Sequence, residues 1–511
     1  MFLGYLRQRG PSLVLVVLVI VTSLLTVHPV SALIRPRYHA PIVIDGNGDF
    51  TQQNGVTGGN GTANNPYTIE GWEIDTNLAD GIAIRNTDAN VIIQNIYIHP
   101  FPSTPYPLGS TYYFGLLLEN TSNIRLLNST LVRNQAGILP CNTDNIIITG
   151  SNISHNYVGI DSLQAGCSPG FNNHFVIDGN RLTENVDGGI RLSYTAHDQI
   201  FNNIISSNGE RNAYLYQSTD IDLSRNQFIS STEGLEFYGT NDVMVSNNTF
   251  SKNGGNGLSA YNASNVAVTS NVFTENGHGF AYGGAAIDLR LATKAVLSDN
   301  TIASNRYGLR LGGATETLVF HNNLLNNTVQ AFDNRPITDD WDAGYPSGGN
   351  FWSDYVGVDN CSGPLQNICL SPDGIGDTHY AFNLNDDRYP LMKPFAPQMF
   401  AAGKYNLGFL NLNSPSRYLT VSIQLPLGLN VSDVVLSSIR LNSTITLAAG
   451  ARATVVSPNH PQVLIVKFNI AEVKTLFTKA GHYSLNLTGN IVDSVAFRSF
   501  AAITVIRVQS R

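Results

Sequence analysis

Acidic, basic and aromatic residues recur at two positions of a short repeated motif, Gly-[Ile/Leu]-x-[Leu/Ile/Phe], in the middle of the chain. The x position of successive copies is occupied by Asp161, Arg191, Glu236, Ser259, Asp288, Arg310 and Asp333. The position two residues further on is occupied by Ser193, Tyr238, Tyr261, Arg290 and Gly312. The copy at residues 213–216 aligns ambiguously. Such carboxylates can move protons, arginines can bind carboxylates, and tyrosines can stack on sugar rings.

The motif belongs to a longer repeat that runs from about Tyr67 to Asp333. The repeat begins [Asn/Ser]-x-[Leu/Ile/Phe]-x-x-Asn, and its first position is filled by Ser129, Ser151, Asn180, Asn203, Asn226, Asn248, Asn271, Asn300 and Asn322. Most steps are 22 or 23 residues, and two insertions of about seven residues, near Cys167 and near 278–282, lengthen two of them. Apolar residues alternate with polar ones and the turns are rich in Asn and Gly, which indicates short strands rather than helices.

One unit of this size cannot bury its own apolar side chains, but units stacked about 4.8 Å apart can. We therefore predict an all-β fold, a right-handed parallel β-helix with coils of about 22 residues, over residues 33–397. Its N-terminal cap precedes the repeats and an Asp-rich cap follows them. The recurring Asn should form a hydrogen-bonded ladder inside the solenoid.

Stacked coils would place both columns of the motif on one outward face, which leaves three interpretations open. In the first, the face binds polysaccharide: Tyr238 and Tyr261 stack on sugar rings, and charged neighbours bond hydroxyls or uronate carboxylates. Those neighbours are Arg290, Arg191, Asp161, Glu236, Asp288 and Arg310.

In the second interpretation the face is catalytic. Glu236 and Asp288 form an acid/base pair two coils apart, roughly 10 Å, as in an inverting hydrolase. A lyase or epimerase would instead use Asp288 beside Arg290 or Arg310. In the third, opposite charges on adjacent coils form a solvated ladder without a ligand.

The two ends of the chain differ from the repeats. Residues 1–32 combine Arg7 and Arg9, an apolar run and a Val-Ser-Ala site, which predicts a signal peptide or, if uncleaved, a membrane anchor. Residues 398–511 contain alternating strands with Gly, Asn and Pro turns, which predicts an immunoglobulin-like β-sandwich. The protein should therefore be extracellular, at the cell surface or periplasmic.

Composition limits the partners and metals. The net charge is −8 and no basic stripe occurs, so a nucleic-acid partner is not expected. The even cysteine set of an exported chain predicts the disulfides Cys141–Cys167 and Cys361–Cys369. No cofactor is required. Calcium is a candidate ligand of the Asp-rich cap, through Asp373 and Asp377, although Asx turns would explain the same residues.

Several segments carry a family resemblance. Residues 41–47 (PIVIDGN), 65–72 (NPYTIEGW), 349–355 (GNFWSDY), 373–377 (DGIGD) and 387–391 (DRYPL) resemble those of NosD-like right-handed β-helix proteins, over about residues 40–397. The resemblance implies a β-helix fold shared with polysaccharide lyases, hydrolases and epimerases. It also implies a role in periplasmic copper-site maturation, although four scattered Met and no His-x-His make copper binding poorly supported.

From the sequence we expect a polysaccharide-binding or structural surface module without catalytic activity. A polysaccharide lyase, hydrolase or epimerase is the alternative, and a NosD-type copper maturation factor is the second.

Overall fold

The structure is a computed structural model. It describes residues 37–101, 113–162, 172–279, 283–335, 338–369 and 371–395, together with parts of 399–506. The predicted signal segment lies outside these residues. Within the part of the chain that is described, no helix has the length and apolar character of a membrane span.

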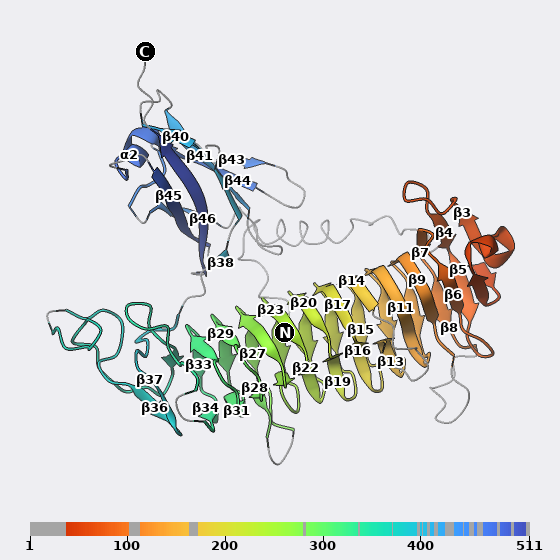
Figure 1. The fold of residues 1–511 in the computed structure, drawn as a ribbon, viewed down its shortest axis with the longest axis horizontal. Helices are drawn as coiled ribbons and strands as arrows, with labels where there is room; N and C mark the ends of the chain where they lie inside the picture. Colours follow the sequence, from red (N-terminus) through yellow and green to blue (C-terminus); the bar gives the residue numbers. More distant parts are fainter. Residues whose placement is uncertain are drawn as a thin grey trace, which may run out of the picture.

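Residues 37–352 form a parallel β-helix in which each strand pairs with its counterpart in the next coil (Figure 1). The first series of strands, which carries the motif, comprises β2 (Ile42–Asp45), β6 (Ile82–Thr87), β9 (Leu116–Leu127), β11 (Ala136–Thr149), β13 (Val158–Asp161), β16 (Gly188–Ser193), β19 (Arg211–Tyr216), β22 (Glu233–Tyr238), β25 (Leu258–Tyr261), β28 (Ala285–Arg290), β31 (Tyr307–Gly312) and β34 (Val329–Asp333).

Two further series complete each coil. The second comprises β4 (Tyr67–Glu70), β7 (Val91–Gln94), the later parts of β9 and β11, β14 (Asn172–Asp178), β17 (Thr195–Phe201), β20 (Thr219–Ser224), β23 (Asn241–Ser246), β26 (Ser264–Thr269), β29 (Val296–Ser298) and β32 (Leu318–Phe320). The third comprises β1 (Arg37–His39), β5 (Trp72–Asp75), β8 (Tyr97–His99), β10 (Thr130–Val132), β12 (Asn152–Ser154), β15 (Arg181–Thr183), β18 (Ile204–Ser206), β21 (Gln227–Ile229), β24 (Thr249–Ser251), β27 (Val272–Thr274), β30 (Thr301–Ala303), β33 (Asn323–Leu325) and β35 (Phe351–Trp352).

Apolar side chains fill the solenoid. Phe228, Phe250 and Phe273 are fully buried and stack with ring centroids 4.9 and 4.5 Å apart, one ring per coil. The core is continuous from the first coil to Trp341 and Trp352, which lie beneath the C-terminal cap. The alternating pattern therefore fixes which face of each strand is buried, because side chains alternate along a strand.

Two ladders of buried polar side chains run inside the corners, as predicted. At each step the Asn Oδ1 accepts hydrogen bonds from the backbone N–H and the Nδ2 of the Asn one coil earlier. At Asn276, for example, Oδ1 accepts from Asn253 at 3.2 and 3.0 Å, and Nδ2 donates to Asn305 at 2.9 Å and to the Phe250 carbonyl at 3.0 Å. Because every ladder residue contacts the next, each coil is held in one register.

Short elements close the two ends. At the N-terminal end are the 3-10 turns η1 (Asn47–Asp49) and η2 (Gln52–Asn54) and the strand β3 (Val56–Gly58), which pairs antiparallel with β4. At the other end β36 (Tyr380–Phe382) and β37 (Asn385–Asp387) form a hairpin. Asp387 is buried there and accepts hydrogen bonds from the Asn350 N–H at 2.7 Å and the Trp352 indole at 2.8 Å, which ends one Asn ladder.

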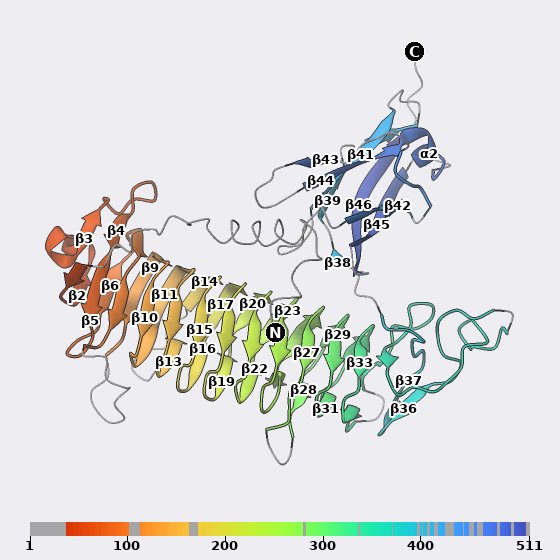
Figure 2. The same ribbon diagram turned by 180° about the vertical axis from the view of Figure 1, so that it is seen from behind.

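The C-terminal segment forms a separate domain with its own apolar core, seen again from behind in Figure 2. One sheet has the order β38-β46-β45-β42, with β40 also pairing β46, and the other has the order β39-β41-β44-β43. Their bounds are β38 (Met399–Phe400), β39 (Ala402–Tyr405), β40 (Phe409–Asn411), β41 (Tyr418–Gln424), β42 (Val434–Leu441), β43 (Thr454–Val456), β44 (Val463–Asn469), β45 (Gly481–Ile491) and β46 (Val495–Ile506), and α2 (Ile470–Lys474) follows β44. The predicted two-sheet sandwich is confirmed.

Candidate functional site

The motif places its x residues in one column across successive strands of the first series. The register partners in order are Asp161, Arg191, Tyr214, Glu236, Ser259, Asp288 and Arg310. The second column is Ser193, Tyr216, Tyr238, Tyr261, Arg290 and Gly312. Both predicted columns are therefore present. The coil at residues 213–216, whose alignment was ambiguous, contributes Tyr214 to the first column and Tyr216 to the second.

That coil departs from the motif because Asn212 stands where its neighbours have glycine. A Cβ at Gly234 would lie 3.0 Å from the Asn253 Nδ2 of the inner ladder, so glycine is needed there. Beside Asn212 the ladder residue is Ser231, whose shorter side chain leaves room. The Ser231 hydroxyl donates to Asn212 Oδ1 at 2.5 Å, and Asn208 Nδ2 donates to the same oxygen at 2.9 Å.

The predicted place of Asp333 in the outward column is wrong by one residue. Phe332 pairs with Arg310, whereas Asp333 pairs with Leu311 and is fully buried. The cause is again a missing glycine: Gln330 stands opposite Gly308. Its side chain turns inward and accepts a hydrogen bond from Asn327 Nδ2 at 2.8 Å.

A groove of about 700 Å³ lies on this face, across the four consecutive strands β19, β22, β25 and β28 (strand series in Figure 1). Its lining includes Glu236, Tyr238, Tyr261, Asp288 and Arg290, the five residues predicted to share one surface. Arg211, Glu210, Glu233 and Asn256 also line it. The sequence therefore predicted half of the groove, the half that follows the glycine of each motif.

Three groove carboxylates are paired with arginine. Glu236 accepts a charge-assisted hydrogen bond from Arg211 Nε, and Arg211 also pairs with Glu210 at 2.8 Å. The Asp288 side chain is only 1% exposed, and its Oδ2 accepts from Arg290 Nη2 at 2.8 Å and Arg310 Nη2 at 2.5 Å. Asp288 Oδ1 is buried without a hydrogen-bond partner among the described residues.

Four tyrosines form a stack along the outward face, and two of them, Tyr238 and Tyr261, line the groove. Tyr216 and Tyr238 stack at 5.6 Å, Tyr238 and Tyr261 stack at 5.0 Å, and Tyr194 meets Tyr216 edge-on at 5.6 Å. Tyr238 thus has a neighbour on both ring faces. Tyr261 is 38% exposed, and its other register neighbour is Arg290, whose side chain is 56% exposed. Tyr238 and Tyr261 are thus about equally exposed, and Tyr261 lies at the end of the stack, next to Arg290.

Glu233 is a groove residue that the motif search missed, because it precedes the glycine. Its Oε2 accepts the Asn256 backbone N–H at 2.9 Å. Burial, together with the charges of Glu236 and Asp288, raises the pKa of the Glu233 carboxyl to about 7, against the hydrogen bonds of Asn256, which lower it. One sequence pattern could have revealed this position. The residue at the same place in three successive coils is polar: Arg211, Glu233 and Asn256.

Asp161 and Arg191 lie two or more coils before Glu236 and do not line the groove. Arg191 donates to Asp161 at 2.6 and 3.3 Å and also pairs with Asp187. Arg310 is half-buried behind the groove, where it holds Asp288 and donates to Asn256 Oδ1 at 3.4 Å. The structure thus brings together six of the eight predicted catalytic and binding residues, with Arg310 in a supporting position.

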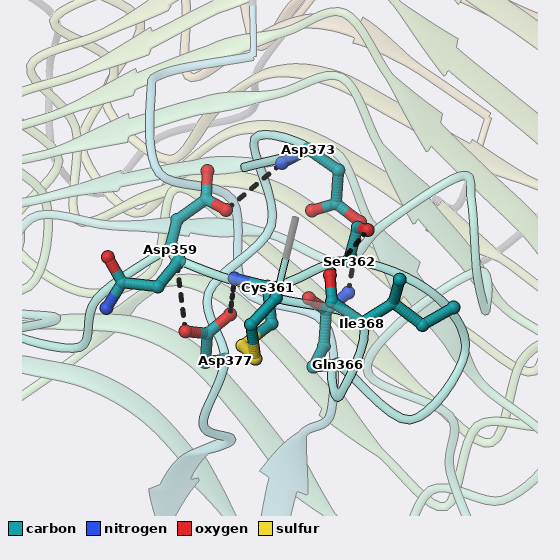
Figure 3. Close-up of a disulfide and its surroundings, with 9 residues drawn as sticks. Asp359, Cys361, Ser362, Gln366, Ile368, Asp373 and Asp377 are labelled. Carbon is teal, nitrogen blue, oxygen red and sulfur yellow. Dashed lines mark hydrogen bonds between the residues drawn. A yellow bond between two sulfur atoms is a disulfide. The ribbon is translucent and has the colours of Figure 1, made fainter. Parts of the chain in front are cut away.

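The Asp-rich cap loop is organised by backbone hydrogen bonds (Figure 3). Asp377 accepts from the N–H groups of Asn360 and Cys361, at 2.9 and 3.1 Å, and Asp373 accepts from the N–H of Ile375 at 3.1 Å. Asp359 accepts from the N–H groups of Asp373 and Gly374. The Asp373 contact is an Asx turn, whereas Asp377 and Asp359 each tie together two segments of the loop. Among the described residues, no three His, Cys, Asp or Glu side chains gather as metal ligands.

The same loop contains the predicted Cys361–Cys369 disulfide. Cys141 is also disulfide-bonded, but Cys167 lies outside the described residues. A copper site finds no donor set in the described chain. His174 and His197 stack at 5.1 Å, but each Nδ1 is bonded to a different carboxylate, Asp144 and Asp220. Copper sites group Met, His or Cys donors, so the residues described do not fit that metal.

Two family models match the solenoid. Residues 170–284 and 205–357 match the model described as periplasmic copper-binding protein (NosD). Residues 42–198 match the model described as right handed beta helix region. Together they span residues 42–357, which contains every strand of the groove. No curated protein matches the chain by sequence.

Solved structures share the fold at low identity. The A-module of the Azotobacter vinelandii mannuronan C-5 epimerase AlgE6 is 14% identical, over 54% of this chain and 89% of that chain, with a TM-score of 0.41. DFA-IIIase from Arthrobacter chlorophenolicus A6 is 14% identical over 49% and 67%, with a TM-score of 0.39. The Dettilon tailspike protein is 12% identical over 84% and 82%, with a TM-score of 0.37. Likeness at this level carries no argument about activity.

Proposed function

This chain belongs to the NosD-like right-handed β-helix family, and we propose that it is an exported protein that binds one polysaccharide chain along the groove. The observation that carries the proposal is the in-register placement of aromatic, acidic and basic side chains on four consecutive strands. A linear polymer needs such a line of contacts, because each sugar must meet a new set of side chains.

The dimensions and chemistry of the groove suit a glycan. Four strands give three steps of about 4.8 Å, so the groove extends about 14 Å along the solenoid axis. Tyr261 offers an accessible ring face for a pyranose, as aromatic side chains do in sugar sites. Arg290 beside it is held by Asp288 and can donate hydrogen bonds to sugar hydroxyls or to a uronate carboxylate. A hydroxyl-rich chain carrying some carboxylate groups would satisfy both.

Export is part of the proposal. The Cys361–Cys369 disulfide is of a kind that persists outside the reducing cytosol. The first 32 residues have the composition of a signal peptide. We therefore place the protein at the cell surface, outside the cell or in the periplasm. Since the described residues lack a copper donor set, copper maturation is the weaker candidate, and a purely structural module is what remains if no glycan binds.

Affinity electrophoresis of the full chain tests the proposal, in gels containing alginate, polygalacturonate, xylan or a neutral β-glucan. We expect at least one polymer to retard the wild type, and Tyr261→Ala to weaken that retardation about tenfold, equivalent to about 1.4 kcal/mol. Tyr38→Ala is the matched control, because Tyr38 is exposed on β1, outside the groove series. Equal retardation of the Tyr261→Ala and wild-type proteins would contradict the groove as the binding site.

A further inference from the structure

The groove is lined by four carboxyl side chains with different electrostatic surroundings, of which Glu210 is paired with Arg211. Glu236 is paired with Arg211, and Asp288 is paired with Arg290 and Arg310. Glu233 forms no ion pair among those of the described residues, and its hydrogen bond comes from the neutral backbone N–H of Asn256. A cation favours the ionised form of a carboxyl, and burial without one favours the protonated form. Glu233 is therefore the groove carboxyl that is held by hydrogen bonds from Asn256 and not by an ion pair within the described part of the chain.

Glu233 is built into the groove wall. Its Oε2 receives the Asn256 N–H, while its Oε1 lies where a Cβ on Gly255 would approach it to 2.2 Å, so glycine makes the space for this side chain. Asn256 is itself held, because its Oδ1 accepts the Ala285 N–H at 2.8 Å and a hydrogen bond from Arg310 at 3.4 Å. Glu233 thus has a fixed position on the same coil as Glu236.

Glu236 and Asp288 differ in access. The Asp288 side chain is 1% exposed and shares one oxygen between two guanidinium groups, so its role is to hold Arg290 in the groove. The Glu236 side chain is 24% exposed. One Glu236 oxygen accepts from Arg211, which leaves the other for a water molecule. Glycoside hydrolysis uses two carboxyl side chains, one as proton donor and one as base, and Glu233 and Glu236 lie on the same strand, β22.

We propose that the groove hydrolyses a glycosidic bond of the chain it binds, with Glu233 as the proton donor and Glu236 as the general base. This inference rests on the proposed polysaccharide binding. Glu233 gives its proton to the glycosidic oxygen as the bond from that oxygen to the anomeric carbon breaks. A water molecule forms the new bond to the anomeric carbon and gives a proton to Glu236. Proton exchange with solvent restores both side chains, and the products are two shorter chains.

The raised pKa of Glu233 agrees with this assignment. Burial, together with the charges of Glu236 and Asp288, raises the pKa of Glu233 to about 7. A proton donor with a pKa near the working pH is protonated before reaction and still acidic enough to transfer. The rate should therefore fall as pH rises through about 7, because Glu233 then loses its proton.

The test compares reducing-end release from the retarded polysaccharide by the wild type, Glu233→Gln and Glu184→Gln. Gln keeps the shape of Glu and an acceptor for the Asn256 N–H, so we expect Glu233→Gln to bind within about twofold of wild type. Its rate should fall about 100- to 10,000-fold, the usual loss for a missing general acid. Glu184 is exposed, pairs with His155 and lies outside the groove, so Glu184→Gln should match wild type.

A leaving-group comparison separates proton donation from a structural role. In a dinitrophenyl glycoside of the same oligosaccharide, the leaving group needs no proton. The loss of hydrolysis rate caused by Glu233→Gln should therefore be at least tenfold smaller on this substrate than on the polysaccharide. An equal deficit on both substrates would remove Glu233 as the donor. If no polymer retards the wild type, the binding proposal fails. If one does but no reducing ends appear between about pH 4 and pH 8, or an unsaturated product forms instead, hydrolysis is overturned while binding stands.

Discussion

Replacing Asn276 by Ala should destabilise the coils on either side of it. The side chain is fully buried and makes four hydrogen bonds, two accepted from Asn253 and one donated to each of Phe250 and Asn305. Asn253 Nδ2 keeps a second acceptor, the Phe228 carbonyl, and Asn305 Oδ1 keeps the N–H of residue 276. The Asn253 backbone N–H is left buried without the acceptor that it has in the wild type.

The cost follows from this inventory. One orphaned buried N–H costs about 1–3 kcal/mol and each of the other three lost bonds about 0.5–1 kcal/mol, so the total is roughly 3–6 kcal/mol. Asn276→Ser is the matched control, because Ser231 already occupies one step of this ladder and its hydroxyl accepts the Asn208 N–H at 3.1 Å. The Ser variant should lose about half as much as the Ala variant.

Hydrogen exchange read by mass spectrometry measures the effect locally, which suits a solenoid because its coils contact mainly their neighbours. We expect protected amides of residues 247–305 in Asn276→Ala to exchange about a hundredfold faster or more, with residues 82–161 unchanged. If exchange in 247–305 stays within about threefold of wild type, the ladder does not hold the register and the reasoning fails.

Three further outcomes are expected. Phe250→Ala removes the central ring of the Phe stack and should cost about 3–5 kcal/mol, while Phe250→Leu should cost less than half of that. Urea unfolding would measure the stability of both variants. A Phe250→Ala protein that unfolds at the wild-type urea midpoint would contradict the contribution of the stacked rings. Burial raises the pKa of Asp198 to about 7, so the stability that Asp198 contributes is full below about pH 4 and is lost as pH rises to 7, by at most about 1.4 kcal/mol per unit. Urea unfolding at several pH values should show that Asp198→Asn weakens this slope, and an unchanged slope would assign it to other groups. The Cys361→Ser and Cys369→Ser double variant should be cleaved faster by thermolysin near Leu365, while hydrogen exchange in residues 227–274 stays unchanged. Faster exchange in residues 227–274 would show that the disulfide also stabilises the coils.

The inner surface of the β-helix was predictable from sequence because one repeat length and one ladder residue fix every coil. The outer columns followed from that register for Glu236, Tyr238, Tyr261, Asp288 and Arg290. Three of the residues that were missed or misplaced lie in coils where another residue replaces the motif glycine, whereas Glu233 precedes an intact glycine. Asn212 hid Tyr214 and Tyr216, and Gln330 shifted Asp333 from the outside to the core.

Ion pairing was not predictable from the same pattern, because it depends on which rotamers meet across strands. Arg211 lies opposite Glu233 in the register but bonds to Glu236. That diagonal choice leaves Glu233 without an ion pair among the described residues. The repeat pattern predicted that the charged residues share one face. Which of the carboxyl groups form ion pairs depends on side-chain contacts that the pattern does not specify.

Asn226 and Asn248 occupy equivalent positions one coil apart, so a whole coil could be inserted between them without changing the bonds of the Asn ladder. Both residues make the same bonds to the coil before and the coil after, so a second copy of residues 226–247 inserted between them would meet familiar partners on each side. The groove would become longer by one step of about 4.8 Å and gain two Glu and one Tyr. Duplication of the gene segment for a single coil can thus lengthen the ligand-binding surface, while the packing of the interior stays the same.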